Sequence, residues 1–182
     1  KTNVPVITTV MGRGAIPTDH PLYVGNVGMH GAYAANMSVN ECDLLFSIGT
    51  RFNDRITGKL HSFAPHAQIV HIDIDTAAIS RNVQVDVPIV ADAKEAVERM
   101  LEYVTECGTK EWLDEVNEWK SSHPMTMKQK PIMTPQDIIE KMNEMFDEAI
   151  IVTDVGQHQM FAAQFVELTQ KKRLLMSGGL GT

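Results

Sequence analysis

Two arginines, Arg51 and Arg55, follow directly after an uncharged run, in the stretch GTRFNDRITG at residues 49–58. A guanidinium offers a planar fork of donors that suits a diphosphate or the edge of a flavin ring. Gly49 would let such a ligand approach the backbone closely. The alternative is a solvated loop in which Asp54 pairs with the arginines. The local sequence leaves these two interpretations even.

Acidic residues end two other uncharged runs. Asp73 and Asp75 lie in HIDID, and Asp92 ends VAD. A carboxylate at the end of a parallel strand commonly accepts hydrogen bonds from ribose hydroxyls, whereas an Asp just before a helix caps it. We expect Asp75 to cap a helix over residues 76–82, which leaves Asp73 as the better ribose candidate. Asp92 stays open between the two roles.

The stretch VGQHQ opens a helix after a further uncharged run. Gly156, Gln157 and His158 would present backbone N–H groups and the positive end of the helix dipole to an anion. Capping by Asp154 or Gln157 is the alternative. Together with the glycine-rich SGGLGT at residues 177–182, the pattern favours a phosphate site.

Other chemical signals in the sequence are weaker. MGRG has Gly12 and Gly14 but lacks the third glycine of the dinucleotide fingerprint, and the seven histidines show no zinc spacing. Among the histidines, His30 between two glycines and His158 suggest contact with a ligand. We expect His71, inside a strand, to be a satisfied core residue.

Parallel strands must position these stretches, because ligands of such sheets bind at the carboxyl ends of strands. Uncharged, β-branched runs alternate with helical patterns, which predicts an α/β fold with a Rossmann-like parallel sheet covered on both faces. We expect residues 15–31 to form a loop and Thr134 to cap a helix that opens at Pro135. The expected strands cover residues 4–10, 43–49, 67–75, 85–92, 149–156 and 173–179, and the expected helices begin at residues 32, 76, 93, 110, 135 and 157.

The sequence pattern changes after Cys107, and this change indicates the domain organisation. We expect a domain at residues 1–106, a helical connector and linker at 107–134, and the truncated start of a second α/β domain at 135–182. The net charge of -7 argues against nucleic-acid binding, and no apolar run is long enough for a membrane span. Two isolated cysteines fit a reducing cytosol better than a disulfide framework.

Four strings of residues carry a resemblance to a known family. GMHG, GTRFNDRITG, VGQHQM and SGGLGT, in this order, closely resemble catalytic large subunits of the acetohydroxyacid synthase (acetolactate synthase) family, which depends on thiamine diphosphate (ThDP). The resemblance covers essentially the whole chain. Pyruvate oxidase and glyoxylate carboligase share the layout but are less similar in these strings. A non-catalytic nucleotide-binding module is the alternative from a different class.

The resemblance implies a fold and an activity. It implies that residues 1–106 form most of a central FAD-binding domain, whose family sheet has six parallel strands, and that residues 135–182 begin the domain that binds the ThDP diphosphate. The family decarboxylates pyruvate and joins the resulting two-carbon unit to a second 2-ketoacid, which gives acetolactate or acetohydroxybutyrate for branched-chain amino acid synthesis. FAD is there a structural requirement without net redox.

The resemblance also implies roles for individual positions. The positions that match FAD contacts are Thr9, Val10, His30, Gly49, Thr50, Arg51, Arg55, Ile56, Asp73, Ile74, Ile79, Asp92 and Ala93. The positions that match ThDP contacts are Gly156, Gln157, His158 and Gly181, and those that match the substrate channel are Met29, Asp54 and Arg55. This chain departs from the family at Asn53, where an acid is usual, and at Asp73, where some relatives have Glu.

Further implications concern what lies outside these residues. The family's catalytic glutamate and its Mg2+ ligands match no position here, so we expect no catalytic or metal-binding residue in this chain and no activity from it alone. The resemblance also implies a cytoplasmic homodimer or homotetramer with a small regulatory subunit.

Overall fold

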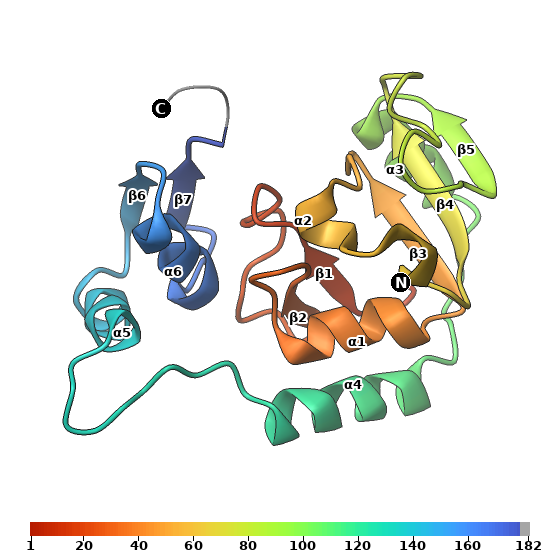
Figure 1. Ribbon diagram of the computed structural model, residues 1–182. Helices are drawn as coiled ribbons and strands as arrows, with labels where there is room; N and C mark the ends of the chain where they lie inside the picture. Colours follow the sequence, from red (N-terminus) through yellow and green to blue (C-terminus); the bar gives the residue numbers. More distant parts are fainter. Residues whose placement is uncertain (179–182) are drawn as a thin grey trace.

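The computed structural model describes residues 1–178 and shows strands and helices alternating along the chain (Figure 1). The strands are β1 (Val6–Thr8), β2 (Tyr23–Asn26), β3 (Leu44–Ile48), β4 (Gln68–Asp73), β5 (Val87–Val90), β6 (Ala149–Thr153) and β7 (Lys172–Met176). The helices are α1 (Tyr33–Glu41), α2 (Asp54–Thr57), a 3-10 turn (Leu60–Ser62), α3 (Ala93–Met100), α4 (Lys110–Ser122), α5 (Pro135–Met145) and α6 (Gln157–Phe165).

All the strand pairs are parallel, which confirms the predicted α/β class. β1 pairs with β2, β3 pairs with β4 and β4 with β5, and β6 pairs with β7. Within residues 1–106 the five strands therefore lie in two sheets, whereas the resemblance implied one sheet of six strands. The carboxyl ends of β3, β4 and β5 meet at one edge, because Gly49 N donates to Ile72 O at 2.8 Å and Ala91 N donates to Asp73 O at 3.2 Å.

The second face of the three-stranded sheet is covered only in part by the described residues. In β3, Ser47 is buried, whereas the alternate side chains of Leu44, Phe46 and Ile48 are 52%, 39% and 45% exposed. Successive strand residues point to opposite faces, so these three apolar side chains share one face. On the same face, Ile72 of β4, the cross-strand partner of Ile48, is fully buried. The prediction that helices cover both faces is therefore wrong for β3 and not for the whole sheet.

The predicted boundaries fail at three places. Residues 15–31 contain β2, a strand of only four residues interrupted by Gly25. Residues 76–82 form turns in place of a helix, and Ser80 there has a φ of 55°, which a right-handed helix does not allow. The helix that begins at Ala93 ends at Met100, well short of Cys107.

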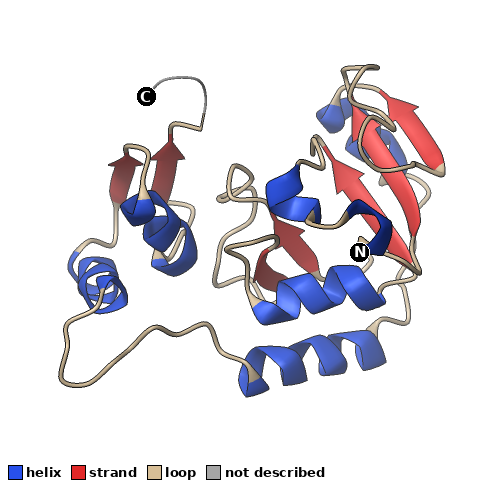
Figure 2. Ribbon diagram, in the orientation of Figure 1, coloured by secondary structure: helices blue, strands red, loops and turns tan. Residues whose placement is uncertain are grey.

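Two hydrophobic cores hold the fold together. The first lies between α1, α4 and the strands of residues 1–106, and Val116 of the connector helix α4 is buried in it at 2% exposure. α4 packs along α1, as Figure 2 shows. The second core joins α5 and α6 to β6 and β7, with Ile139 and Leu174 among its buried residues. None of the described helices combines the length and the apolar character that crossing a membrane requires.

The predicted cap of α5 is confirmed. Thr134 Oγ1 accepts a hydrogen bond from Asp137 N, and the Asp137 carboxylate accepts one from Thr134 N, so the two residues form a capping box with Pro135 in the first turn.

Candidate functional site

The loop at residues 49–58 has an unusual backbone. Gly49 and Phe52 have positive φ angles of 62° and 46°, and Phe52 is nevertheless 4% exposed. Its ring packs edge-on against His71 of β4, with 5.1 Å between the ring centroids. A bulky residue with positive φ persists only where its surroundings hold it. Phe52 therefore anchors the loop to the sheet, and the exposed Arg51 and Arg55 project from that anchor.

The ion pair in this loop is weak. Arg55 Nε lies 4.0 Å from Asp54 Oδ2, and the two side chains are 69% and 81% exposed. Exposed pairs of this kind contribute about 0–1 kcal/mol. The salt-bridge alternative thus gives the loop little stability, and the arginine donors stay accessible to an anionic ligand. Asn53, the position that departs from the family, makes no side-chain cap to the short helix α2.

The structure brings the GMHG loop against the arginine loop. Met29 N donates to Arg55 O at 2.8 Å, and Arg55 Nη1 lies 3.8 Å from Met29 Sδ. Gly28 permits this approach, because a Cβ atom at position 28 would lie 2.4 Å from Arg55 O. Met29, Asp54 and Arg55, which the resemblance assigned to a substrate channel, are therefore neighbours. His30 is exposed beside them.

Asp73 and His71 lie at the end of β4. Asp73 Oδ1 accepts from Asp75 N at 2.9 Å, and Asp73 Oδ2 lies 3.8 Å from His71 Nε2. His71 is fully buried, yet neither ring nitrogen has a hydrogen-bond partner. The prediction that His71 is a core residue is confirmed, and the prediction that its polar atoms are satisfied is wrong. A carboxylate has about four lone-pair sites, and Asp73 uses one of them to accept from Asp75 N, so acceptor capacity remains at the strand edge.

The other two acids have capping or turn roles. Asp92 Oδ1 accepts from Lys94 N at 2.8 Å and Glu95 N at 3.2 Å and so caps α3. Asp75 caps no helix; its carboxylate accepts from Ala77 N at 2.9 Å in a turn. This turn corrects the expected helix start.

The remaining flavin-matched positions follow β1, β3 and β4 or lie at the start of α3. Thr9 follows β1 and its hydroxyl accepts from Gly12 N at 3.0 Å. Ile74 is 73% exposed after β4, and Ile79 is half-buried in the turns that follow. The other matched positions are Val10 after β1, Thr50 and Ile56 in the arginine loop, and Ala93 at the start of α3.

The start of α6 has the geometry of an anion site. Gly156 precedes the helix with a φ of 147°, and no side chain caps the first turn. Asp154, one of the two expected caps, accepts from Val155 N instead. Gln157 and His158 are exposed in that turn. Gly181 lies outside the described residues.

Both groups of residues fit the cofactors that the resemblance implies. An uncapped first helical turn offers N–H donors and a positive dipole end to a diphosphate. Two exposed guanidiniums after β3 and a carboxylate at the end of the neighbouring strand β4 suit the diphosphate and ribose of a dinucleotide. Within residues 1–178 no group of three or more His, Cys, Asp or Glu side chains could hold a metal ion.

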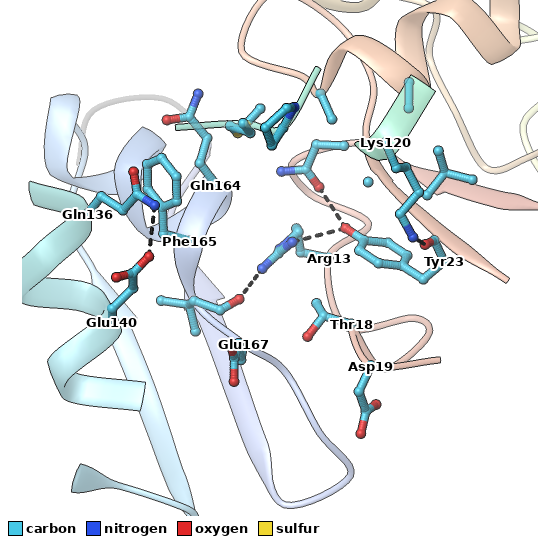
Figure 3. Close-up of a pocket in the computed structure, with 18 of the residues that line it drawn as sticks. Arg13, Thr18, Asp19, Tyr23, Lys120, Gln136, Glu140, Gln164, Phe165 and Glu167 are labelled. Carbon is cyan, nitrogen blue, oxygen red and sulfur yellow. Dashed lines mark hydrogen bonds between the residues drawn. The ribbon is translucent and has the colours of Figure 1, made fainter. Parts of the chain in front are cut away.

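A cavity of about 600 Å3 lies between the two parts of the chain, away from the predicted cofactor residues (Figure 3). Arg13, Tyr23 and Asn26 line it on one side, and Gln164 and Val166 lie on the other. Across this cavity, Asn26 donates to the carbonyl of Ala163 in α6, and Arg13 donates to the carbonyl of Val166, directly after the helix. The sequence analysis missed these residues, because an arginine between two glycines carries no sign of a partner about 150 residues away.

Comparisons with known proteins identify the family of the chain. Residues 1–100 match the family described as "Thiamine pyrophosphate enzyme, central domain". The chain is 46% identical to the probable acetolactate synthase large subunit of Methanocaldococcus jannaschii, over 98% of this chain and 32% of that protein. It is 42% identical to the acetolactate synthase large subunit of Cyanidium caldarium, again over 98% of this chain and 32% of the relative.

A third relative is the acetolactate synthase isozyme 3 large subunit of Escherichia coli, which is 39% identical over 99% of this chain and 33% of that protein. The chain therefore spans about a third of the length of these relatives. The family match covers more than half of the chain and includes the arginine loop, the GMHG loop and the end of β4. The chain belongs to the thiamine pyrophosphate enzyme family.

Proposed function

We propose that this chain is part of an acetolactate synthase large subunit, which decarboxylates pyruvate and joins the two-carbon unit to a second 2-ketoacid in branched-chain amino acid biosynthesis. The observation that carries the proposal is similarity to acetolactate synthase large subunits along 98–99% of the chain. The proposal divides the chain into a flavin-binding domain at residues 1–106, a connector at 107–134, and the start of the ThDP domain at 135–182.

In the first domain, the flavin dinucleotide lies along the edge formed by the carboxyl ends of β3, β4 and β5. Arg51 and Arg55 donate to its diphosphate, and Asp73 accepts from its ribose. The arginine loop is suited to this because Phe52 fixes it on the sheet while both guanidiniums stay exposed. Met29, Asp54 and Arg55, held together by the Gly28 contact, line the path of the substrate.

In the second part, the first turn of α6 binds the diphosphate of ThDP through its backbone N–H groups, with Gln157 and His158 beside it. When bound, ThDP supplies the carbanion stabilisation that the removal of carbon dioxide from a 2-ketoacid requires. Mg2+, bound by residues beyond those described here, would neutralise the same diphosphate. A cytoplasmic location, a homodimer or homotetramer, and a small regulatory subunit complete the proposal.

The test uses the full-length gene product with pyruvate, ThDP, Mg2+ and FAD. We expect acetolactate as the product and no net consumption of oxygen. Oxygen-dependent turnover of pyruvate without acetolactate would contradict the proposal and would favour a pyruvate oxidase. Arg51→Met should weaken FAD binding, measured by quenching of flavin fluorescence, by roughly tenfold or more, because a charge-assisted hydrogen bond contributes about 1.5–3 kcal/mol. Arg81→Met, an exposed arginine in the turns after β4, is the matched control.

A further inference from the structure

The carbonyl end of α6 is bonded by side chains from the first part of the chain. Asn26 Nδ2 donates to Ala163 O at 2.7 Å, and a guanidinium nitrogen of Arg13 donates to Val166 O, directly after the helix. The last carbonyls of a helix have no partner within the helix and carry the negative end of its dipole. Asn26 and Arg13 therefore satisfy two of these carbonyls, and Asn143 Nδ2 of α5 donates to a third, Phe165 O, at 2.9 Å. The arginine also places a positive charge at this negative end.

These two side chains belong to a buried network at β1 and β2. Arg13 Nη1 donates to the Tyr23 hydroxyl at 2.9 Å, and this hydroxyl and that of Thr8 donate to Asn26 Oδ1 at 3.2 and 3.1 Å (Figure 3 shows the Arg13–Tyr23 contact). Thr8, Tyr23 and Asn26 are 7%, 7% and 4% exposed. Because each side chain is held by another, the network sets the position of the two donors that reach α6.

The network is not explained by stability alone. Arg13 Nε is buried without a hydrogen-bond partner, which is destabilising. A further contact confines the same segment, because Thr18 N donates to Leu168 O and Leu168 N donates to Thr18 Oγ1, both at 2.8 Å. The first part of the chain thus holds α6 and the residues after it through polar groups, and one of them, Arg13 Nε, is buried without a partner.

The opposite end of α6 is the anion site. α6 has nine residues and is therefore about 13 Å long. Its first turn has no side-chain cap, and Gln159 ties it to the end of β7 through a bond from Nε2 to Ser177 O at 2.7 Å. Because α6 is one unbroken helix from Gln157 to Phe165, we expect a displacement at its carbonyl end to shift the N–H groups at its other end. Small displacements weaken the binding of a ligand held by directed hydrogen bonds.

We propose that Arg13 and Asn26 are positioning residues for the diphosphate of ThDP, which they influence through α6 without contacting it. The inference rests on the proposed function of the α6 N-terminus. It makes the contact between the two parts of the chain a determinant of cofactor affinity.

The test compares the affinities of two probes, ThDP and thiamine monophosphate, in variants of the full-length gene product. Arg13→Met keeps the aliphatic stem and removes the donors. We expect it to weaken ThDP binding about fivefold to tenfold, within the usual range of coupling between sites. Thiamine monophosphate, which lacks the second phosphate, should lose less affinity than ThDP. The ratio of the two affinities should therefore be smaller in the variant than in the wild type. Arg99→Met, an exposed arginine on α3, is the matched control and should bind both probes as the wild type does.

The outcomes separate the inference from the proposed function. If the wild type binds neither probe, the proposed function fails. If the wild type binds ThDP and Arg13→Met shows an unchanged ratio of affinities, the inference is overturned while the proposed function stands. A merely structural role would lower the melting temperature without changing that ratio. If Arg13→Met does not fold, Arg13→Lys against Arg99→Lys decides in the same way, because lysine keeps the charge but cannot bridge two acceptors in a fixed fork.

Discussion

Gly28 and Arg55 approach each other more closely than any other residue at position 28 would allow. The Arg55 carbonyl also accepts from Met29 N, so two loops far apart in the sequence share one backbone contact. That contact fixes the backbone of the arginine loop at Arg55. The backbone of Arg55 is therefore positioned by its contact with the loop at Gly28.

Gly28→Ala tests this contact. The added Cβ would lie 2.4 Å from Arg55 O, and the φ of 107° disfavours alanine. We expect the free energy of unfolding to fall by about 1–3 kcal/mol, measured by urea denaturation, because neither loop can move without losing a hydrogen bond. Gly108→Ala is the control, since its Cβ would meet nothing within 4 Å. Equal effects of the two substitutions would contradict the close-packing argument.

At the scale of elements, α5 illustrates how local chemistry sets a boundary. Thr134 and Asp137 bond reciprocally, and the hydrogen bonds from the Thr134 hydroxyl and then its backbone N–H lower the pKa of Asp137 below its ordinary 3.8. A carboxyl whose pKa is lower in the folded state stabilises the fold above its unfolded pKa. That stabilisation is lost as the pH falls below the unfolded pKa and through the lower pKa of the folded state.

Thr134→Val removes the hydroxyl and should weaken the cap by about 0.5–2 kcal/mol at about pH 7. The difference from the wild type should narrow at acid pH, below the lowered pKa of Asp137, where the wild type has also lost the ionised partner. Urea midpoints at the two pH values measure both effects. Thr105→Val, at an exposed position outside any helix or strand, is the control. A difference that does not depend on pH would show that the carboxylate is not part of the cap.

For the whole molecule, the exposed side of β3 departs from the expected sheet with both faces covered. Leu44, Phe46 and Ile48 form an exposed apolar row on it. A contiguous apolar surface of this kind favours association in water. The chain by itself should therefore tend to associate through this apolar row, although it has two hydrophobic cores.

Leu44→Lys should reduce the fluorescence of the dye ANS bound to the 182-residue chain and lower its tendency to associate, measured by light scattering. The change in unfolding free energy should be about 0.5 kcal/mol or less, because the side chain is 52% exposed. Tyr103→Lys is the control, since Tyr103 is 81% exposed outside this row. Unchanged dye binding in Leu44→Lys would locate the dye elsewhere.

The sequence by itself determined most of the elements and the family. β-branched, uncharged runs identified six of the seven strands, and Thr134 with Pro135 identified the start of α5, because these signals are local. β2 was missed because a four-residue strand interrupted by glycine has no detectable period. The turns at residues 76–82 were misassigned because helix propensity over so few residues is easily overridden by backbone geometry such as that of Ser80.

Only the tertiary structure decided which residues meet. It brought Met29 to Arg55, placed the unpaired His71 beside Asp73, and joined Arg13 and Asn26 to the end of α6. These contacts depend on packing between segments that are far apart along the chain. Periodicity and motif spacing describe only neighbours in sequence, so they name the groups that can do chemistry but not the groups that hold them in place.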